Sequence, residues 1–187
     1  NEIESGTLES FEICKILRSQ GKGGGAKAYL MMGELSNQAA VQRTKDVDDV
    51  LGMDMCNFIE IIDRQTANWS REQANSLMTN WLSSGEEFDA VFANNDEMAI
   101  GAIQAMKSAG LDMDVIVVGG VDATQDALAA MQAGDLDVTV FQNAAGQGSG
   151  ALNAAIALAN GEDVDQKVYI PFELVTPANI NNYLSKN

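Results

Sequence analysis

The stretch AVFANNDEMAIGAIQAMKSAGLDMDVIVVGGVDATQDALAAMQAGDLDVTVFQ, residues 90–142, decides the fold. It contains short apolar runs at 90–93, 115–119 and 138–141, separated by segments with the apolar spacing of helices. Short apolar runs that alternate with helices are typical of the buried strands of a parallel sheet. The stretch therefore predicts an α/β fold, a doubly wound parallel sheet with helices on both faces.

Each apolar run is followed by a polar residue: Asn95, Asp122 or Gln142. The loops that leave the carboxyl ends of neighbouring parallel strands converge on one crevice, where ligands bind in such sheets. We therefore expect these side chains to face a common pocket. Neutral amides and one carboxylate suit the hydroxyls of a polyol and are poorly suited to covalent chemistry.

The rest of the chain continues the alternation of strand and helix. Strands are predicted near 28–32, 58–63, 89–93, 115–119 and 137–141, with a last one at 168–170. Helices are predicted at 7–20, 36–51, 124–133 and 145–160. A further helix begins with a capping box of Ser70 and Gln73, and another begins at Asp96 and ends at Gly110. The glycine-rich GKGGG at 21–25 lacks the spacing of a phosphate loop and predicts a flexible turn.

Composition excludes several classes of function. The 187 residues carry a formal net charge of −16, which argues against a nucleic-acid or anionic-membrane partner. The absence of histidine removes the usual general base and the commonest zinc ligand. No apolar run is long enough to span a bilayer, and the polar opening NEIESGTLES does not have the pattern of a signal peptide. Cys14 and Cys56 are expected to be buried free thiols rather than a disulfide, which leaves the compartment open.

A family resemblance runs through nearly the whole chain. The segments GELSNQAAVQRTKDV, QTANWSREQA, FANNDEMAIGAIQAMKSAG, VVGGVDATQDALAAMQAG, VTVFQ and YIPFELVTPANI occur in the order and at the spacing of the family. Together they resemble the second half of a type I periplasmic sugar-binding protein of an ABC importer. Within that group the chain is most similar to the ribose, inositol and rhizopine binders.

The resemblance implies a domain organisation. Residues 1–142 and 172–187 correspond to the C-terminal sugar-binding lobe of the family. Residues 143–171 correspond to a helix and a strand that belong to the N-terminal lobe, and the rest of that lobe is absent. The helix at 145–160 would then expose apolar side chains, which predicts self-association through it.

The resemblance also implies the ligand site. By matching motifs, the ligand-binding residues are expected to be Arg43, Trp69, Asn95, Asp122, Gln142 and, as a weaker match, Asn37. The chemistry is coherent, because a guanidinium donates to hydroxyls in fixed geometry, a carboxylate accepts from them, and an indole covers the C–H face of a sugar ring.

Each candidate also has a purely structural explanation, which the sequence leaves open. Arg43, near Asp46 and Asp48, could be a solvated surface cation. The remaining alternatives are a hydrophobic staple for Trp69, helix caps for Asn95 and Asp96, a plain turn for Asp122 and an ordinary strand end for Gln142.

The expected function is the solute-binding component of an ABC importer for a sugar or cyclic polyol. Its partners would be the small-molecule ligand and a membrane permease, and its location the periplasm. No catalytic residue, metal or cofactor is expected. The alternative is the effector-sensing domain of a sugar-responsive transcriptional repressor. An enzyme that uses Asp122 or Glu97 is disfavoured, because a glycosidase needs a second facing carboxylate that the sequence does not show.

Overall fold

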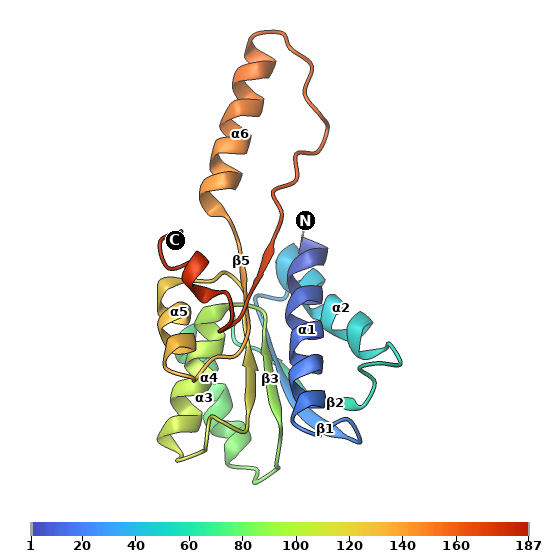
Figure 1. Ribbon diagram of the computed structural model, residues 1–187, viewed down its shortest axis with the longest axis vertical. Helices are drawn as coiled ribbons and strands as arrows, with labels where there is room; N and C mark the ends of the chain where they lie inside the picture. The colour runs from blue at the N-terminus through green and yellow to red at the C-terminus, as the bar shows by residue number, and fades with distance from the viewer. Residues whose placement is uncertain (1, 187) are drawn as a thin grey trace.

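The computed structural model describes residues 2–186, and it alternates helix and strand for most of its length (Figure 1). In chain order the elements are α1 (Glu2–Ser19), β1 (Ala26–Met32), α2 (Gln38–Leu51), β2 (Ile59–Thr66), α3 (Arg71–Leu82), β3 (Ala90–Ala93), α4 (Asp96–Ser108), β4 (Val117–Gly119), α5 (Gln125–Gln132), β5 (Thr139–Phe141), α6 (Ala144–Ala159), β6 (Glu173–Val175) and the 3₁₀ turn η1 (Ile180–Asn182).

The central sheet is parallel, in the order β2-β1-β3-β4. Isolated parallel bridges join Gly119 to Val138 and Asp122 to Phe141, so β5 continues the sheet beyond β4. β5 also pairs with β6, in antiparallel register. The predicted parallel sheet is therefore confirmed, and the candidate loops all leave it at its carboxyl edge.

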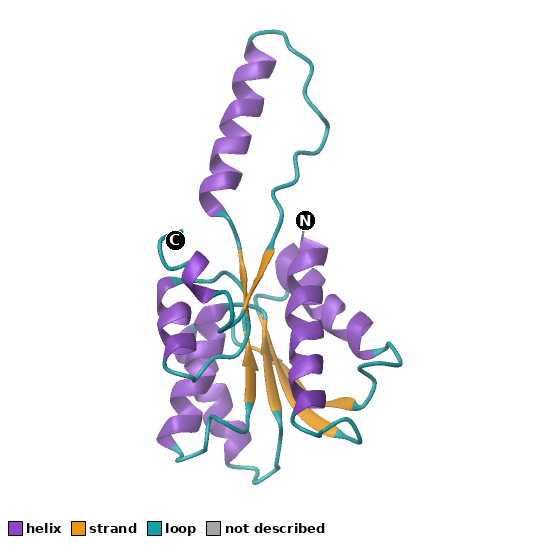
Figure 2. Cartoon of the chain, in the orientation of Figure 1, coloured by secondary structure: helices purple, strands orange, loops and turns teal. Residues whose placement is uncertain are grey.

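Helices cover both faces of the sheet, as predicted (Figure 2). α1 and α2 lie on one face, where Ile13, Leu17, Val47 and Val50 form a core with the strands. α3, α4 and α5 cover the other face with a second apolar core. Burial of both sheet faces explains why the predicted strands are continuous apolar runs.

A disulfide joins α1 to the loop before β2, which corrects the expectation of free thiols. The Cα atoms of Cys14 and Cys56 lie 5.7 Å apart and their sulfur atoms are bonded. The expectation failed because the cysteines are 42 residues apart in sequence, and only the packing of α1 on the sheet brings them together.

α1 also packs closely against α2. At Gly6 of α1, an added Cβ would be 2.7 Å from the carbonyl oxygen of Arg43.

The predicted strand at 168–170 is wrong. These residues form no ladder, and the strand that pairs with β5 is β6 instead, at Glu173–Val175. The apolar residues at 168–170 have no neighbouring strand in the part of the chain that the structure describes, and Pro171 has no N–H to donate.

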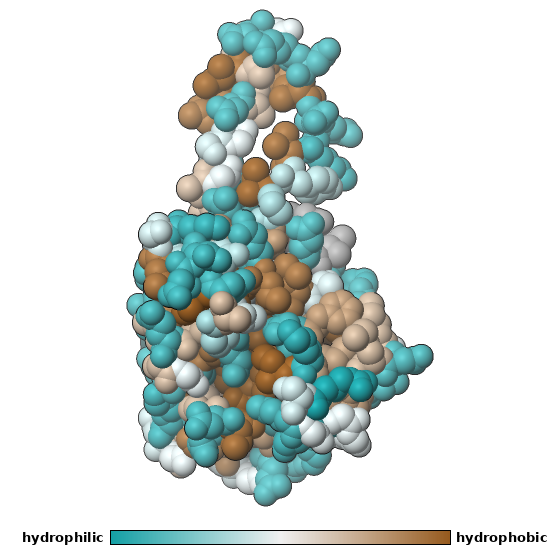
Figure 3. Space-filling model, viewed as in Figure 1, coloured by the Kyte–Doolittle hydropathy of each residue, from teal (hydrophilic) through white to brown (hydrophobic). Residues whose placement is uncertain are grey.

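α6 and the segment that returns from it project away from the body of the molecule (Figure 1). No residue of α6 is buried, and Leu152, Ile156 and Leu158 are between 51% and 64% exposed. Apolar surface appears on this projecting arm in Figure 3. The structure therefore confirms the prediction that this helix exposes apolar side chains. Within residues 2–186, no helix combines the length and apolar character needed to cross a membrane.

Candidate functional site

Arg43 is at the centre of the candidate site. It is only 4% exposed, so the interpretation as a solvated surface cation is wrong. Nη1 donates to the carbonyl oxygen of Asn94 at 2.7 Å and lies 3.6 Å from a carboxylate oxygen of Asp122. Nη2 donates to Oε1 of Gln142 at 3.3 Å. Arg43 on α2 thus joins the ends of β3, β4 and β5.

Trp69 lies beside this arginine. The Arg43 guanidinium carbon is 5.8 Å from the centre of the indole ring. Trp69 and the preceding Asn68 both adopt positive φ, at 64° and 51°. This turn carries the indole back over Gly33, where an added Cβ would collide with the ring. Trp69 is half-buried, so part of the ring stays accessible.

The two asparagine candidates are helix caps. Oδ1 of Asn95 accepts the N–H of Met98 at 3.1 Å at the start of α4, and Oδ1 of Asn37 accepts the N–H of Ala39 at 2.9 Å at the start of α2. The structural explanation for Asn95 is therefore confirmed, and its ligand role stays a prediction. Asn37 is exposed, and none of the described contacts joins it to Arg43. Asp96, the other expected cap, is instead the buried first residue of α4.

Asp122 and Gln142 border an open cavity of about 460 Å³ at the carboxyl edge, together with Thr124, Gln125 and Ala144. Asp122 does not lie in a plain turn, because its φ of 124° is a conformation that residues other than glycine rarely adopt. Gln142 follows the last residue of β5, and its N–H donates to the carbonyl oxygen of Asp122 at 3.3 Å. The two side chains therefore reach the cavity from adjacent strand ends.

Sequence reasoning missed two residues that contact this cluster. Oδ1 of buried Asn94 accepts from the backbone N–H of Gly33 and from the hydroxyl of Thr44, both at 3.1 Å. The ring of Phe172 lies 6.0 Å from the guanidinium carbon of Arg43. Asn94 directly precedes a predicted site residue, which is the signal that could have found it. Phe172 reaches the cluster through the antiparallel pairing of β5 and β6, which the sequence pattern did not predict.

Three carboxyl groups near the candidate site are buried: Glu9, Asp46 and Asp96. Oε1 of Glu9 accepts the N–H of Ala93 at 3.2 Å, and burial raises the pKa of Glu9 to about 8. Burial likewise raises the pKa values of Asp46 and Asp96 to about 6. The positive charge of Arg43 lowers the pKa of Glu9 and of Asp96, but by less than burial raises it. Glu9 and Asp96 thus interact electrostatically with Arg43, and neither of them lines the cavity.

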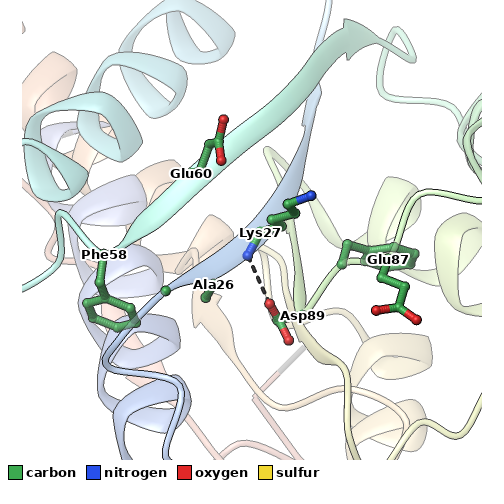
Figure 4. A pocket seen from close by; sticks show the side chains of 8 residues that line it. Ala26, Lys27, Phe58, Glu60, Glu87 and Asp89 are labelled. Carbon is green, nitrogen blue, oxygen red and sulfur yellow. Dashed lines mark hydrogen bonds between the residues drawn. The ribbon is translucent and has the colours of Figure 1, made fainter.

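A second cavity lies at the opposite edge of the sheet (Figure 4). It measures about 350 Å³ and includes Lys27, Glu60, Glu87 and Asp89, at or next to the amino ends of the strands. The backbone N–H of Lys27 donates to Asp89 there. Parallel α/β sheets bind their ligands at the carboxyl edge, so the candidate site is the cavity beside Asp122 and Gln142. Over residues 2–186, no group of histidine, cysteine and acidic side chains is arranged to hold a metal ion.

A family model described as a periplasmic binding protein domain matches residues 12–163. This chain belongs to the periplasmic binding protein family. A family member from Rhizobium meliloti, whose name gives rhizopine binding as a provisional assignment, is 64% identical over 187 residues, which are 100% of this chain and 59% of that protein. The xylitol-binding protein of Mycolicibacterium smegmatis is 36% identical over 160 residues, covering 85% of this chain and 45% of that protein.

A solved structure extends the comparison to three dimensions. It is an ABC transporter solute binding protein from Bacillus halodurans C-125 with bound myo-inositol, 43% identical and with a TM-score of 0.90. The match covers 100% of this chain and 62% of that structure. The chain thus spans about 60% of the length of the Rhizobium meliloti protein and of this solved structure. The relatives are solute-binding proteins rather than enzymes.

Proposed function

We propose that this protein is the solute-binding component of an ABC importer for a sugar or cyclic polyol. The observation that supports the proposal most strongly is the cluster of Arg43, Asp122 and Gln142 beside an open cavity at the carboxyl edge. The names of the similar proteins include xylitol, ribose and myo-inositol, which are all small molecules rich in hydroxyl groups. The protein would work in the periplasm and deliver its ligand to a membrane permease.

Each candidate residue has a distinct role in this proposal. The Arg43 guanidinium donates to ligand hydroxyls, the Asp122 carboxylate accepts from them, and the Gln142 amide can do both. The indole of Trp69 covers the C–H face of the ring. Asn95 and Asn37 contribute amide N–H groups, since their oxygen atoms are already used as helix caps.

The lobe assignment belongs to the same proposal. Residues 1–142 and 172–187 form the C-terminal lobe, and residues 143–171 belong to an N-terminal lobe. The exposed apolar side chains of α6 support this assignment, because they are placed as if to pack against further protein. The ligand would be enclosed between the lobes by hinge closure.

Titration calorimetry with myo-inositol, xylitol and ribose tests the proposal on the protein expressed from its own gene. Asp122→Ala should weaken binding of the best ligand by about 2–4 kcal/mol, because it leaves buried donors without an acceptor. Asp126→Ala is the control, since Asp126 lies on the neighbouring helix and pairs with Arg71 on the surface. Absence of heat with all three polyols would contradict the function, and unchanged affinity of the Asp122 variant would remove Asp122 from the site.

A further inference from the structure

Asp96 is a buried carboxylate that joins three separate segments of the chain. Its backbone N–H donates to the carbonyl oxygen of Val121 at 2.8 Å. Oδ2 accepts the N–H of Thr124 at 2.8 Å, and Oδ1 accepts the hydroxyl of Thr139 at 2.7 Å. Asp96 begins α4, Thr124 lies in the loop after β4, and Thr139 begins β5. One side chain thus ties together the ends of β3 and β4 and the start of β5.

The Thr139 hydroxyl extends this network by one hydrogen bond. It accepts the N–H of Ala123 at 3.1 Å while it donates to Asp96. The loop after β4 is therefore held on both sides of Asp122, at Val121 before it and at Ala123 and Thr124 after it. Space is tight as well, because a Cβ added to Gly120 would lie 2.6 Å from Oδ1 of Asp96.

The loop held in this way has an unfavourable backbone conformation. Asp122 has φ at 124° and Ala123 has φ at 53°. Residues with side chains persist in such conformations only where their surroundings hold them, and the strain is often associated with function. Here the strained conformation places the Asp122 carboxylate at the cavity and 3.6 Å from Arg43.

We propose that Asp96, acting through Thr139, is a positioning residue that sets the direction of the Asp122 carboxylate for ligand binding. This inference rests on the proposed function, since it assigns Asp96 a role in the same site. Asp96 and Thr139 are completely buried, and neither lines the cavity. Their effect on the ligand would pass through the backbone of residues 121–124.

The matched variants are Thr139→Val and Thr139→Ser. Valine keeps the shape of threonine but removes the hydroxyl, so the N–H of Ala123 loses its acceptor and Asp96 loses a donor. Serine keeps the hydroxyl and both hydrogen bonds. Asp96→Asn is a second, independent variant, because Thr124 and Thr139 donate to different oxygens of Asp96 and the amide replaces one of these oxygens with an NH₂ group that cannot accept. Ile103→Val on α4 controls for a general loss of core packing.

The experiment is a double-mutant cycle on the protein expressed from its own gene, with affinity for myo-inositol, xylitol and ribose measured by calorimetry and folding checked by circular dichroism. We expect Thr139→Val to weaken binding at least about ten-fold, and Thr139→Ser and Ile103→Val by less than about three-fold. In the Asp122→Ala background, Thr139→Val should change affinity by less than about two-fold, because the group that it positions is already absent. Asp96→Asn should behave like Thr139→Val in both backgrounds.

The outcomes separate this inference from the proposed function. If none of the polyols binds, or if Asp122→Ala binds as well as the unmodified protein, the proposed site is wrong. If Asp122→Ala loses affinity but Thr139→Val does not, the site stands and the positioning role is overturned. Equal losses from Thr139→Val in the two backgrounds would also overturn it, since they would show a general structural effect that does not pass through Asp122.

Discussion

Gly33 determines where the indole of Trp69 can lie. The ring covers Gly33 so closely that any side chain there would overlap it. Gly33 also donates its N–H to Asn94, which anchors the loop beside Arg43. The glycine therefore fixes the position of the aromatic surface relative to the guanidinium.

Gly33→Ala should displace the indole and destabilise the fold by about 1–3 kcal/mol, the usual cost of forcing an extra methyl group into a packed site. Ligand affinity should also fall, because the displaced indole no longer lies in place beside Arg43. Gly24→Ala is the matched control, because an added Cβ at Gly24 meets no atom within 4 Å. Tryptophan fluorescence measures the displacement of the indole, and chemical unfolding measures the loss of stability. Unchanged emission and stability in the Gly33 variant would contradict the close contact.

Glu9 should make the stability of the fold depend on pH. Burial raises its pKa from 4.5 to about 8, so the folded state holds a proton that the unfolded state releases. The raised pKa means that the contribution of Glu9 to stability is complete below pH 4.5 and is lost as pH rises toward 8. Near the middle of this window the loss approaches about 1.4 kcal/mol per pH unit. Asp46 and Asp96 add a loss in the same direction at lower pH, since their pKa values are also raised.

Glu9→Gln should therefore flatten the fall in unfolding free energy between pH 7 and pH 8, where Asp46, Asp96 and Asp137, with pKa values of about 6, contribute little further change. Urea unfolding at both pH values measures the difference. Glu12→Gln, on the same helix, is the control and should retain the full dependence. A Glu9 variant that loses stability between these pH values as steeply as the unmodified protein would show that Glu9 does not titrate in this window.

The bond between Cys14 and Cys56 anchors α1, which carries Glu9, to the loop before β2. A disulfide that closes a loop of this length stabilises a protein by about 2–4 kcal/mol, mainly by restricting the unfolded chain. The double variant Cys14→Ala/Cys56→Ala should be less stable by that amount. Chemical unfolding with and without a reductant checks this. The reductant should destabilise the unmodified protein and leave the variant unchanged, and equal stability of all four samples would contradict the disulfide.

The candidate cavity is open to solvent. α6 projects away from the body of the molecule (Figure 1). Hydrogen bonds on an open surface compete with water and contribute only about 0.5–1.5 kcal/mol each. We therefore expect the 187-residue chain by itself to bind ribose, myo-inositol or xylitol no more tightly than about millimolar. Titration calorimetry tests this, and micromolar binding by a monomer would contradict it.

The exposed apolar side chains of α6 should make this chain self-associate. Light scattering over a range of protein concentrations measures the association. Replacing Leu152 and Ile156 with serine should reduce it, because these side chains supply much of the exposed apolar surface of the helix. Leu35→Ser is the control, since Leu35 is also exposed but lies in the loop before α2. A monomer at all concentrations would rule out this role for α6.

The amino-acid sequence was sufficient to predict the parallel strands of the central sheet. The apolar runs at 90–93, 115–119 and 138–141 predicted buried parallel strands, because a strand covered by helices on both faces must be apolar along its length. The N-cap at Ser70 was confirmed, since the Ser70 side chain accepts the N–H of Gln73 within the same helix turn. The second bond of the predicted capping box is not formed, because the Ser70 N–H donates to the carbonyl oxygen of Ala67 and Oε1 of Gln73 accepts from Asn68. Both patterns lie within short segments of sequence, so they can be recognised without knowing which distant residues pack against them.

Only the tertiary structure decided the features that depend on distant contacts. Charge pattern favoured a solvated Arg43, but the packing of α2 on the sheet buries it against the ends of β3, β4 and β5. The disulfide and the network of Asp96 and Thr139 likewise join residues 42 and 43 positions apart. The strand expected at 168–170 failed because a strand needs a partner, and a partner is supplied by the fold rather than by the residues of the strand itself.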